Sequence, residues 1–118
     1  MEIERWMFGD QADLLADRVL KGTKTATCAL YNGEVSQPLN IIVNSQEEDI
    51  CMIEIYEYKI LKYSEMTNQM AVAEGERNLY EWREIHKRYF SSKLGISERD
   101  FDESTKIIYY LFRVIEKY

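Results

Sequence analysis

Apolar residues recur every three or four positions in two segments of the chain, which is the spacing of one face of an α-helix. In the first segment the regularly spaced positions are Ala12, Leu15, Ala16 and Val19. Asp10 stands where an N-cap is expected, and Gly22 stands where a left-handed residue ends a helix. We therefore expect a helix over residues 11–21.

A second helix is predicted after residue 78, because Asn78 and Glu81 have the spacing of a capping box. Its apolar stripe consists of Leu79, Trp82, Ile85, His86 and Tyr89. The preceding segment, residues 64–73, also has a helical pattern. Residues 93–103 are polar and are expected to form a loop with room for a helical turn.

The remaining apolar segments predict β-strands. Residues 3–8 are expected to form a strand or an extended arm, and residues 25–31 are rich in strand-forming and small residues. Two apolar runs flank a polar stretch and predict a hairpin with a loop: 41–43 and 51–61 around 44–49. In residues 106–118, the core 107–112 is apolar at successive positions. This favours a strand covered on both faces, near the centre of a sheet or barrel.

The order of these elements is a strand, a helix, several strands, two helices and a long final strand. Hairpin-linked strands with inserted helices favour an α+β fold over a regular βαβ repeat. The 118 residues lie near the common size of one domain, and no linker or internal repeat divides them. We therefore expect a single domain over residues 1–118.

The charge balance limits the class of partner. The formal net charge is −6 and the isoelectric point is about 4.9. A protein that grips long nucleic acid through its phosphates needs a basic face, so this charge disfavours that function but leaves a local basic pocket open. No apolar run is long enough to cross a membrane. The sequence does not indicate an oligomeric state.

The cysteines and the single histidine give no metal signal along the sequence. Cys28 and Cys51 form no CxxC pair, and His86 is the only histidine in the chain. We therefore assign no metal and no cofactor. Two cysteines without a signal peptide fit a reduced, cytoplasmic compartment, in which both are ordinary small core residues.

Residues 22–27, Gly-Thr-Lys-Thr-Ala-Thr, are the first candidate functional segment. On a regular strand Lys24 and Thr27 point to opposite faces, so they share a site only if the chain turns or bulges after Gly22. Local spacing favours a structural interpretation, in which Lys24 is a solvated cation near a helix end and Thr27 is a strand residue. In the functional interpretation, a partly desolvated Lys24 with a lowered pKa takes the proton of the Thr27 hydroxyl, which attacks an electrophile.

The pair Glu74 and Glu76 also has two interpretations. By local pattern they are ordinary carboxylates near a helix start, and as metal ligands two carboxylates are a weak signal. In the functional interpretation Glu76 holds the lysine or shuttles a proton. His86 is expected to be a hydrogen-bonded core residue, whereas Arg83 beside Trp82 is either solvated or binds an anionic or planar ligand.

Motifs in the same order along the chain resemble the ASCH domain family. They are Trp-Met-Phe-Gly-Asp at residues 6–10, Gly-Thr-Lys-Thr-Ala-Thr-Cys at 22–28, and Ala-Glu-Gly-Glu at 73–76 followed by Trp82, Arg83 and His86. The resemblance spans most of the chain. It implies a PUA-like fold, which is a small, mostly antiparallel β-barrel with flanking helices and a cleft beside the first helix.

The resemblance also implies recognition of RNA or nucleosides. One bacterial branch similar to this chain removes the acetyl group from acetylated cytidine with a lysine, a threonine and a glutamate. By motif, these catalytic positions fall on Lys24, Thr27 and Glu76. Residues around them are assigned to substrate binding: Gly22, Thr25, Glu74, Trp82 and Arg83. The expected partner is a nucleoside or a short single-stranded RNA.

Two further functions stay open. The first is a non-catalytic RNA-binding module that stacks bases on Tyr31 or Trp82 and holds phosphate with Lys24 and Arg83. The second is a metal-dependent ribonuclease on single-stranded RNA, as described for another branch of the family, with its metal near the 74–76 glutamates.

The chain departs from the family pattern at two places. Residues 77–78 lead directly into Leu79, where many relatives have a longer segment with glycine and aspartate. The loop beside the expected pocket is therefore shortened, which bears on substrate specificity. Leu39 and Asn40 stand where relatives often carry a glycine-aspartate turn, so that turn must be built differently.

Overall fold

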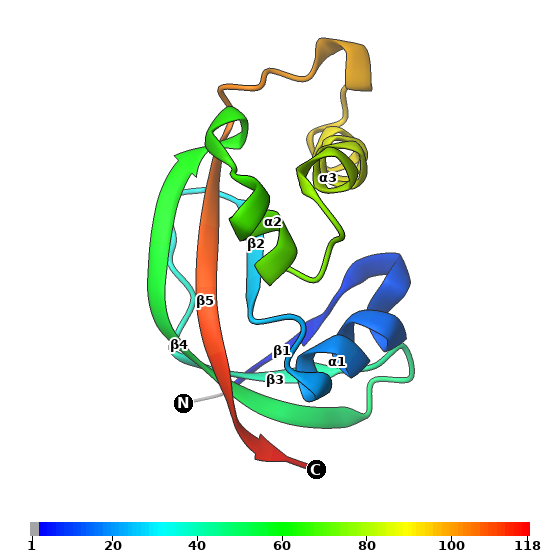
Figure 1. Cartoon of the computed structure of the whole chain (residues 1–118), viewed down its shortest axis with the longest axis vertical. Coiled ribbons are helices and arrows are strands. Elements are labelled where there is room, and N and C mark those ends of the chain that lie inside the picture. Colours follow the sequence, from blue (N-terminus) through cyan, green and yellow to red (C-terminus); the bar gives the residue numbers. More distant parts are fainter. Residues whose placement is uncertain (1–2) are drawn as a thin grey trace.

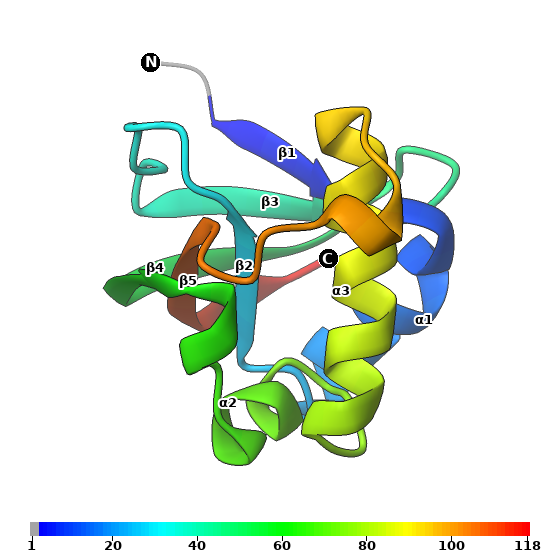
Figure 2. The ribbon, with the colours of Figure 1, turned by 90° about the horizontal axis from the view of Figure 1, so that it is seen from above.

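The computed structural model describes residues 3–118 and shows a curled, five-stranded mixed sheet with three helices (Figures 1 and 2). The strands are β1 (Glu4–Met7), β2 (Ala26–Leu30), β3 (Leu39–Val43), β4 (Asp49–Lys62) and β5 (Lys106–Lys117). They lie in the order β1-β3-β4-β5-β2, in which β1 and β3 are parallel and the other neighbouring pairs are antiparallel. The sheet forms a half-barrel, so the predicted α+β, mostly antiparallel and barrel-like fold is confirmed.

The three helices are α1 (Ala12–Lys21), α2 (Asn68–Ala73) and α3 (Leu79–Leu94). In Figure 1, β4 and β5 curve along one side of the molecule, and α3 and α1 lie opposite them. Two apolar clusters fill the space between the sheet and the helices. One packs Trp82 and Phe90 of α3 against Ile107 of β5, and the other packs α1 against β3, β4 and β5. Within residues 3–118, no helix is long and apolar enough to cross a membrane.

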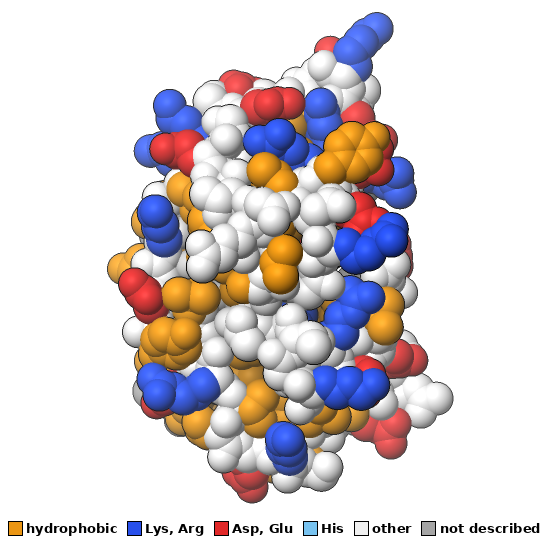
Figure 3. Space-filling view, in the orientation of Figure 1, with side chains coloured by type: hydrophobic (Ala, Val, Ile, Leu, Met, Phe, Trp, Pro, Cys, Tyr) orange, Lys and Arg blue, Asp and Glu red, His pale blue; other side chains and the backbone are white. Residues whose placement is uncertain are grey.

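Acidic, basic and apolar side chains are interspersed on the face shown in Figure 3. The described residues of this face therefore form no continuous basic patch of the kind that grips long nucleic acid through its phosphates.

The first helix ends as predicted but begins differently. Gly22 has φ +80° and its N–H donates to the Val19 carbonyl, which is the left-handed ending that its position indicated. The assignment of Asp10 as N-cap is wrong. A single 3₁₀ turn, Gly9–Gln11, runs directly into α1, and the N-cap position falls on Gln11 without a side-chain hydrogen bond. Asp10 is therefore inside the preceding turn.

The later helices begin at side-chain caps. Asn78 Oδ1 accepts from the backbone N–H of Glu81 at 2.9 Å, as predicted, but the Glu81 carboxylate pairs with Arg77 instead of completing the capping box. The helical pattern over 64–73 divides into a 3₁₀ turn at Tyr63–Glu65 and α2, because Thr67 caps a new helix through Met70 N–H. Helix α3 continues to Leu94, and the following loop carries a 3₁₀ turn at Glu98–Asp100.

Strand β5 lies inside the sheet between β4 and β2. Residues 107–110 are buried at four successive positions, so this part of the strand is covered on both faces, as its continuous apolar run predicted. Leu39 and Asn40 do not form a turn at all. They open β3 and pair with Glu54 and Ile53 of β4.

Candidate functional site

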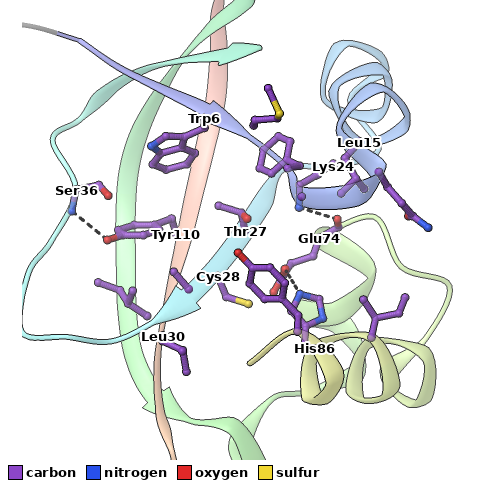
Figure 4. A pocket seen from close by; sticks show the side chains of 18 of the residues that line it. Trp6, Leu15, Lys24, Thr27, Cys28, Leu30, Ser36, Glu74, His86 and Tyr110 are labelled. Carbon is purple, nitrogen blue, oxygen red and sulfur yellow. Dashed lines mark hydrogen bonds and ion pairs between the residues drawn. The ribbon is translucent and has the colours of Figure 1, made fainter. Parts of the chain in front are cut away.

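A cavity of about 1230 Å³ lies between the concave side of the sheet, the loop at residues 32–37, the 74–76 segment and α3. Its walls include side chains from β1, β2 and β5 (Figure 4). The three residues predicted to be catalytic, Lys24, Thr27 and Glu76, all line this cavity. The fold therefore brings together residues that stand about fifty positions apart in the sequence.

The turn after α1 places Lys24 inside the protein. Beyond the left-handed Gly22, the backbone N–H groups of Thr23 and Lys24 both donate to the Arg18 carbonyl at the end of α1. The next N–H, that of Thr25, donates at 2.8 Å to the Ala73 carbonyl at the end of α2. The chain thus changes direction before β2 begins, and the Lys24 side chain is only 3% exposed. The structural interpretation of Lys24 as a solvated cation is wrong.

The Lys24 nitrogen is held by the main chain. Nζ donates to the carbonyl oxygen of Ala26 at 2.8 Å and to that of Glu74 at 2.9 Å. Nζ also lies 4.9 Å from the centre of the Phe8 ring. Since an ammonium has three N–H bonds and a neutral amine has two with one lone pair, either form can satisfy both carbonyls. The two forms differ at the third position of the nitrogen, which carries a proton in the ammonium and a lone pair in the neutral amine.

Burial lowers the pKa of Lys24 below its ordinary value, because desolvation penalises the ammonium more than the nearby Glu74 carboxylate stabilises it. Glu76 and Cys28 act in the same direction as Glu74, and Arg18 acts against them. Lys24 therefore has a fixed position and a proton that is more easily lost than in water.

Thr27 is partly buried on β2 and lines the cavity beside Lys24 (Figure 4). The condition that the two residues face one pocket is met. The hydrogen bonds of the lysine go to main-chain carbonyls, so Glu76 does not hold Lys24 as expected, and Glu74 does so through its backbone. Glu76 acts on Lys24 through its charge and is otherwise a wall of the cavity.

The carboxylate of Glu74 is 2% exposed and has its own set of partners. Oε2 accepts from the indole N–H of Trp82 at 3.0 Å, and Oε1 lies 3.6 Å from Nε2 of His86. Cys28 Sγ lies within 4.8 Å of a Glu74 carboxylate oxygen. Burial alone would raise the pKa of Glu74, but the nearby His86 ring and the charge of Lys24 outweigh burial and leave that pKa below its usual value.

Four of the residues assigned to substrate binding lie outside the cavity wall. The described residues that line the cavity do not include Gly22, Thr25, Trp82 or Arg83. Trp82 is fully buried, so it supports Glu74 and cannot stack on a ligand. Arg83 is exposed, and its carbonyl accepts from the Tyr63 hydroxyl at 2.8 Å. Thr25 is exposed and tied to α2 by its N–H, while Gly22 serves the turn.

Sequence reasoning missed several residues of the cavity wall. The aromatic ones are Trp6, Phe8, Tyr89 and Tyr110. Trp6 and Phe8 belong to the first family motif, which was an available signal for them. Tyr110 lies in the continuous apolar run, where nothing in the pattern separates a cavity wall from a packed core.

The expectation for His86 is half right. Its Nδ1 is hydrogen-bonded to the Trp82 carbonyl at 2.9 Å, and its ring stacks on the Trp82 ring with centroids 4.3 Å apart. It is nevertheless only partly buried and lines the cavity. Cys28 Sγ, a Glu74 carboxylate oxygen and a ring nitrogen of His86 lie within 4.8 Å of one another. No ligand spacing along the sequence indicates this cluster, because β2, the end of α2 and α3 bring the three residues together.

Gly75 is required between the two glutamates. Its φ is +99°, and an added Cβ would contact Arg18 Cδ at 3.4 Å and Lys24 Cβ at 3.5 Å. The neighbouring carbonyls of Gly75 and Glu74 accept from Arg18 and Lys24, so a shift of this backbone disturbs both bonds. We expect Gly75→Ala to lower the unfolding free energy by about 1–3 kcal/mol.

The matched control for this glycine is Gly33→Ala, because Gly33 has a similar φ of +93° with open space around it. Urea unfolding of both variants compares the loss of stability. A larger loss at Gly75 is expected because its backbone shift disturbs the Arg18 and Lys24 hydrogen bonds, and a loss no greater than that at Gly33 would contradict this reason.

Comparison with known proteins identifies the fold family. The model of the ASCH domain family matches residues 4–116. The crystal structure of an ASCH domain from Lactobacillus crispatus JV V101 superimposes with a TM-score of 0.85 at 28% identity, covering 98% of this chain and 80% of that one. Protein EF3133 from Enterococcus faecalis V583 gives a TM-score of 0.84 at 25% identity, covering 100% and 83%. No curated protein matches. The chain belongs to the ASCH domain family, a family associated with RNA binding.

Proposed function

We propose that this protein hydrolyses the acetyl amide of acetylated cytidine, with Thr27 as nucleophile, Lys24 as general base and Glu76 as the acid-base group at the leaving amine. The observation that carries the proposal is the environment of Lys24. Its buried nitrogen is fixed by two main-chain carbonyls on the wall of a cavity that Thr27 and Glu76 also line.

The reaction is an acyl transfer through a covalent intermediate. The neutral amine of Lys24 keeps two N–H bonds for the carbonyls of Ala26 and Glu74, and its lone pair takes the proton of the Thr27 hydroxyl. The Thr27 oxygen forms a bond to the acetyl carbon, the carbon–nitrogen bond breaks, and the exocyclic amine of cytidine leaves with the proton that Lys24 took from Thr27, passed on through Glu76. Glu76 assists this departure. Water then hydrolyses the acetyl-threonine ester and regenerates the hydroxyl.

The charges of the cavity favour a nucleoside over a phosphorylated ligand. Its wall carries more acidic than basic side chains: Glu4, Asp10, Glu34, Glu74 and Glu76 against Arg5, Lys24 and Arg88. Lys24 is also committed to main-chain carbonyls rather than to a ligand phosphate. An acetylated nucleoside carries no phosphate, so it meets no electrostatic penalty here.

The partly exposed Trp6 ring supplies a surface for a flat base, and the buried Tyr110 ring lies behind it. Trp6 and Tyr110 both line the cavity, with ring centroids 6.0 Å apart and planes inclined by 44°. The Tyr110 hydroxyl accepts from the Ser36 N–H at 3.0 Å, which fixes that ring (Figure 4). Stacking on such rings is worth about 1–3 kcal/mol per base and does not require phosphate contacts.

The proposal is tested by incubating the purified protein with acetylated cytidine and measuring cytidine by chromatography. Release is expected with the wild type and not with Thr27→Val, which keeps the shape of the side chain and removes the nucleophile. If the wild type releases no more cytidine than Thr27→Val, the proposed reaction is wrong.

The rate of this reaction should rise with pH. A base acts in its neutral form, which forms as pH rises through the pKa of Lys24, and burial places that pKa below the ordinary value of 10.5. We expect the rising limb of kcat/KM against pH to have its midpoint below 10.5. A kcat/KM that falls over the same range as pH increases would contradict Lys24 as the base.

The family association supports a second candidate, which is binding of short single-stranded RNA without turnover. The stacking surface of Trp6 and Tyr110 is compatible with it. Fluorescence anisotropy with a labelled single-stranded RNA separates the candidates. Salt-dependent binding without cytidine release would favour the binding module, and cleavage that a chelator abolishes would favour the ribonuclease.

A further inference from the structure

We propose that Cys28, Glu74 and His86 bind a divalent transition-metal cation, and that Zn²⁺ is the ion that fits best. Their potential ligand atoms lie within 4.8 Å of one another although they come from β2, the end of α2 and α3. All three residues line the cavity, so an ion can reach them from solvent. Its ligands differ from the proposed hydrolytic groups Lys24, Thr27 and Glu76, although both sets line the same cavity and the Glu74 carbonyl accepts from Lys24.

The hydrogen bonding of His86 points its free nitrogen into this cluster. Nδ1 lies 2.9 Å from the Trp82 carbonyl oxygen, which can only accept, so Nδ1 carries the proton. In the neutral ring Nε2 then has a lone pair, and it lies 3.6 Å from the carboxylate oxygen Oε1 of Glu74. This 3.6 Å separation is close to the distance between two ligand atoms of one tetrahedral ion, so a cation fits between the ring nitrogen and the carboxylate oxygen. A bound metal ion satisfies both acceptors at once.

The outer contacts of the cluster are those that metal ligands commonly have. A ligating histidine usually donates its other N–H to a carbonyl or carboxylate, as Nδ1 of His86 does to Trp82. The ligating carboxylate is usually hydrogen-bonded as well, and Oε2 of Glu74 accepts from the Trp82 indole at 3.0 Å. Trp82 therefore orients two of the three ligands. Since Nζ of Lys24 donates to the Glu74 backbone carbonyl, it leaves the carboxylate oxygens to the cluster.

The ligand types select the ion. Thiolate, imidazole and carboxylate together suit Zn²⁺, whereas Mg²⁺ and Ca²⁺ take oxygen ligands. With bonds of about 2.0–2.3 Å, tetrahedral ligand atoms stand roughly 3.3–3.8 Å apart, so the three side chains need to close by only about 1 Å. The ion binds Cys28 Sγ in place of the thiol proton, which passes to solvent. The cavity side leaves a fourth position for water.

Cobalt binding gives a direct test, because Co²⁺ occupies zinc sites and a Co²⁺–thiolate bond absorbs in the near ultraviolet. The folded protein is stripped with a chelator, dialysed and titrated with Co²⁺, and Zn²⁺ is then added. We expect one equivalent of Co²⁺ to give the thiolate charge-transfer band together with tetrahedral visible bands, and Zn²⁺ to remove both. The absence of a thiolate band in the wild type would overturn the proposal, because Cys28 would then not bind the ion.

Matched variants locate the site. Cys28→Ser should lose the thiolate band, and Cys51→Ser should keep it, because the buried Cys51 lies in the other apolar cluster. His86→Gln should weaken Zn²⁺ binding by at least about 100-fold, since removal of an outer-shell partner alone costs about 10–100-fold. Circular dichroism confirms that each variant is folded. A thiolate band that survives in Cys28→Ser or disappears in Cys51→Ser would place the metal elsewhere and overturn the assignment.

Discussion

Replacing Lys24 with methionine is expected to lower kcat/KM for acetylated cytidine by about 10²–10⁴-fold, the contribution of a positioned general base. Methionine fills a similar volume in the buried site but offers no lone pair on nitrogen for the Thr27 proton. The matched control is Lys21→Met, because Lys21 is exposed at the end of α1 and forms a surface ion pair with Asp17 at 2.8 Å. Steady-state kinetics on both variants should show the loss only at Lys24.

The stability of the Lys24 variant must be measured together with its rate. Methionine leaves the carbonyls of Ala26 and Glu74 without their donor, at a cost of about 1–3 kcal/mol for each buried group. Removal of a desolvated charge offsets part of that cost. Circular dichroism and urea unfolding show whether the variant is folded under assay conditions. A folded Lys24→Met protein with the kcat/KM of Lys21→Met would rule out Lys24 as the base.

Trp82→Ala is expected to lower the unfolding free energy by about 3–5 kcal/mol, the usual cost of truncating a buried tryptophan. Trp82 is fully buried in the cluster under α2 and α3 and stacks on His86. Its indole N–H also satisfies Glu74, so truncation leaves a cavity and a carboxylate that lacks one donor. Urea unfolding followed by circular dichroism measures the loss.

Two variants of the same helix separate these contributions. Trp82→Phe keeps most of the apolar volume and removes the donor, so it isolates the bond to Glu74, for which about 1–3 kcal/mol is expected. Tyr80→Ala, at a position that is 70% exposed, should change stability by no more than about 0.5 kcal/mol. If Trp82→Ala costs no more than Tyr80→Ala, the role of Trp82 as the support of Glu74 and His86 is wrong.

The elements with a strong period were predictable from the sequence. Helices α1 and α3 and the buried part of β5 follow from apolar spacing, because one face or both faces of each pack on the core. Their boundaries were less predictable. Asp10 has the chemistry of an N-cap, but the turn Gly9–Gln11 includes it and moves the helix start to the next position. The spacing of apolar residues does not show whether a residue caps a helix or belongs to a short turn before it.

The candidate site depends on contacts between distant segments, and local spacing could not supply them. Lys24 is buried because the Thr25 N–H reaches the Ala73 carbonyl and Lys24 itself reaches the Glu74 carbonyl. From the residues around it alone, Lys24 was better explained as solvated. The ordered family motifs carried the correct association of Lys24, Thr27 and Glu76 with one cavity.

For Trp82, in contrast to Lys24, the local pattern was the better guide and the family motif was not. Its place in an apolar stripe already predicted burial, whereas the family pattern suggested contact with a ligand. The structure gives it a supporting position, in which it holds the Glu74 carboxylate and the His86 ring. Cys28 and His86 could not be paired from the sequence, since a ligand spacing read along one segment cannot detect three residues from separate elements.

Mass spectrometry of the reacting protein tests the proposed mechanism most directly. The protein is mixed with acetylated cytidine, quenched with acid at short times and digested for peptide mapping. The mechanism predicts cytidine release and one acetyl group on Thr27 in the wild type, and neither in Thr27→Val. Cytidine release by Thr27→Val at the wild-type rate, with no acetyl group on the Thr27 peptide of the wild type, would contradict Thr27 as the nucleophile and with it the proposed function of Lys24.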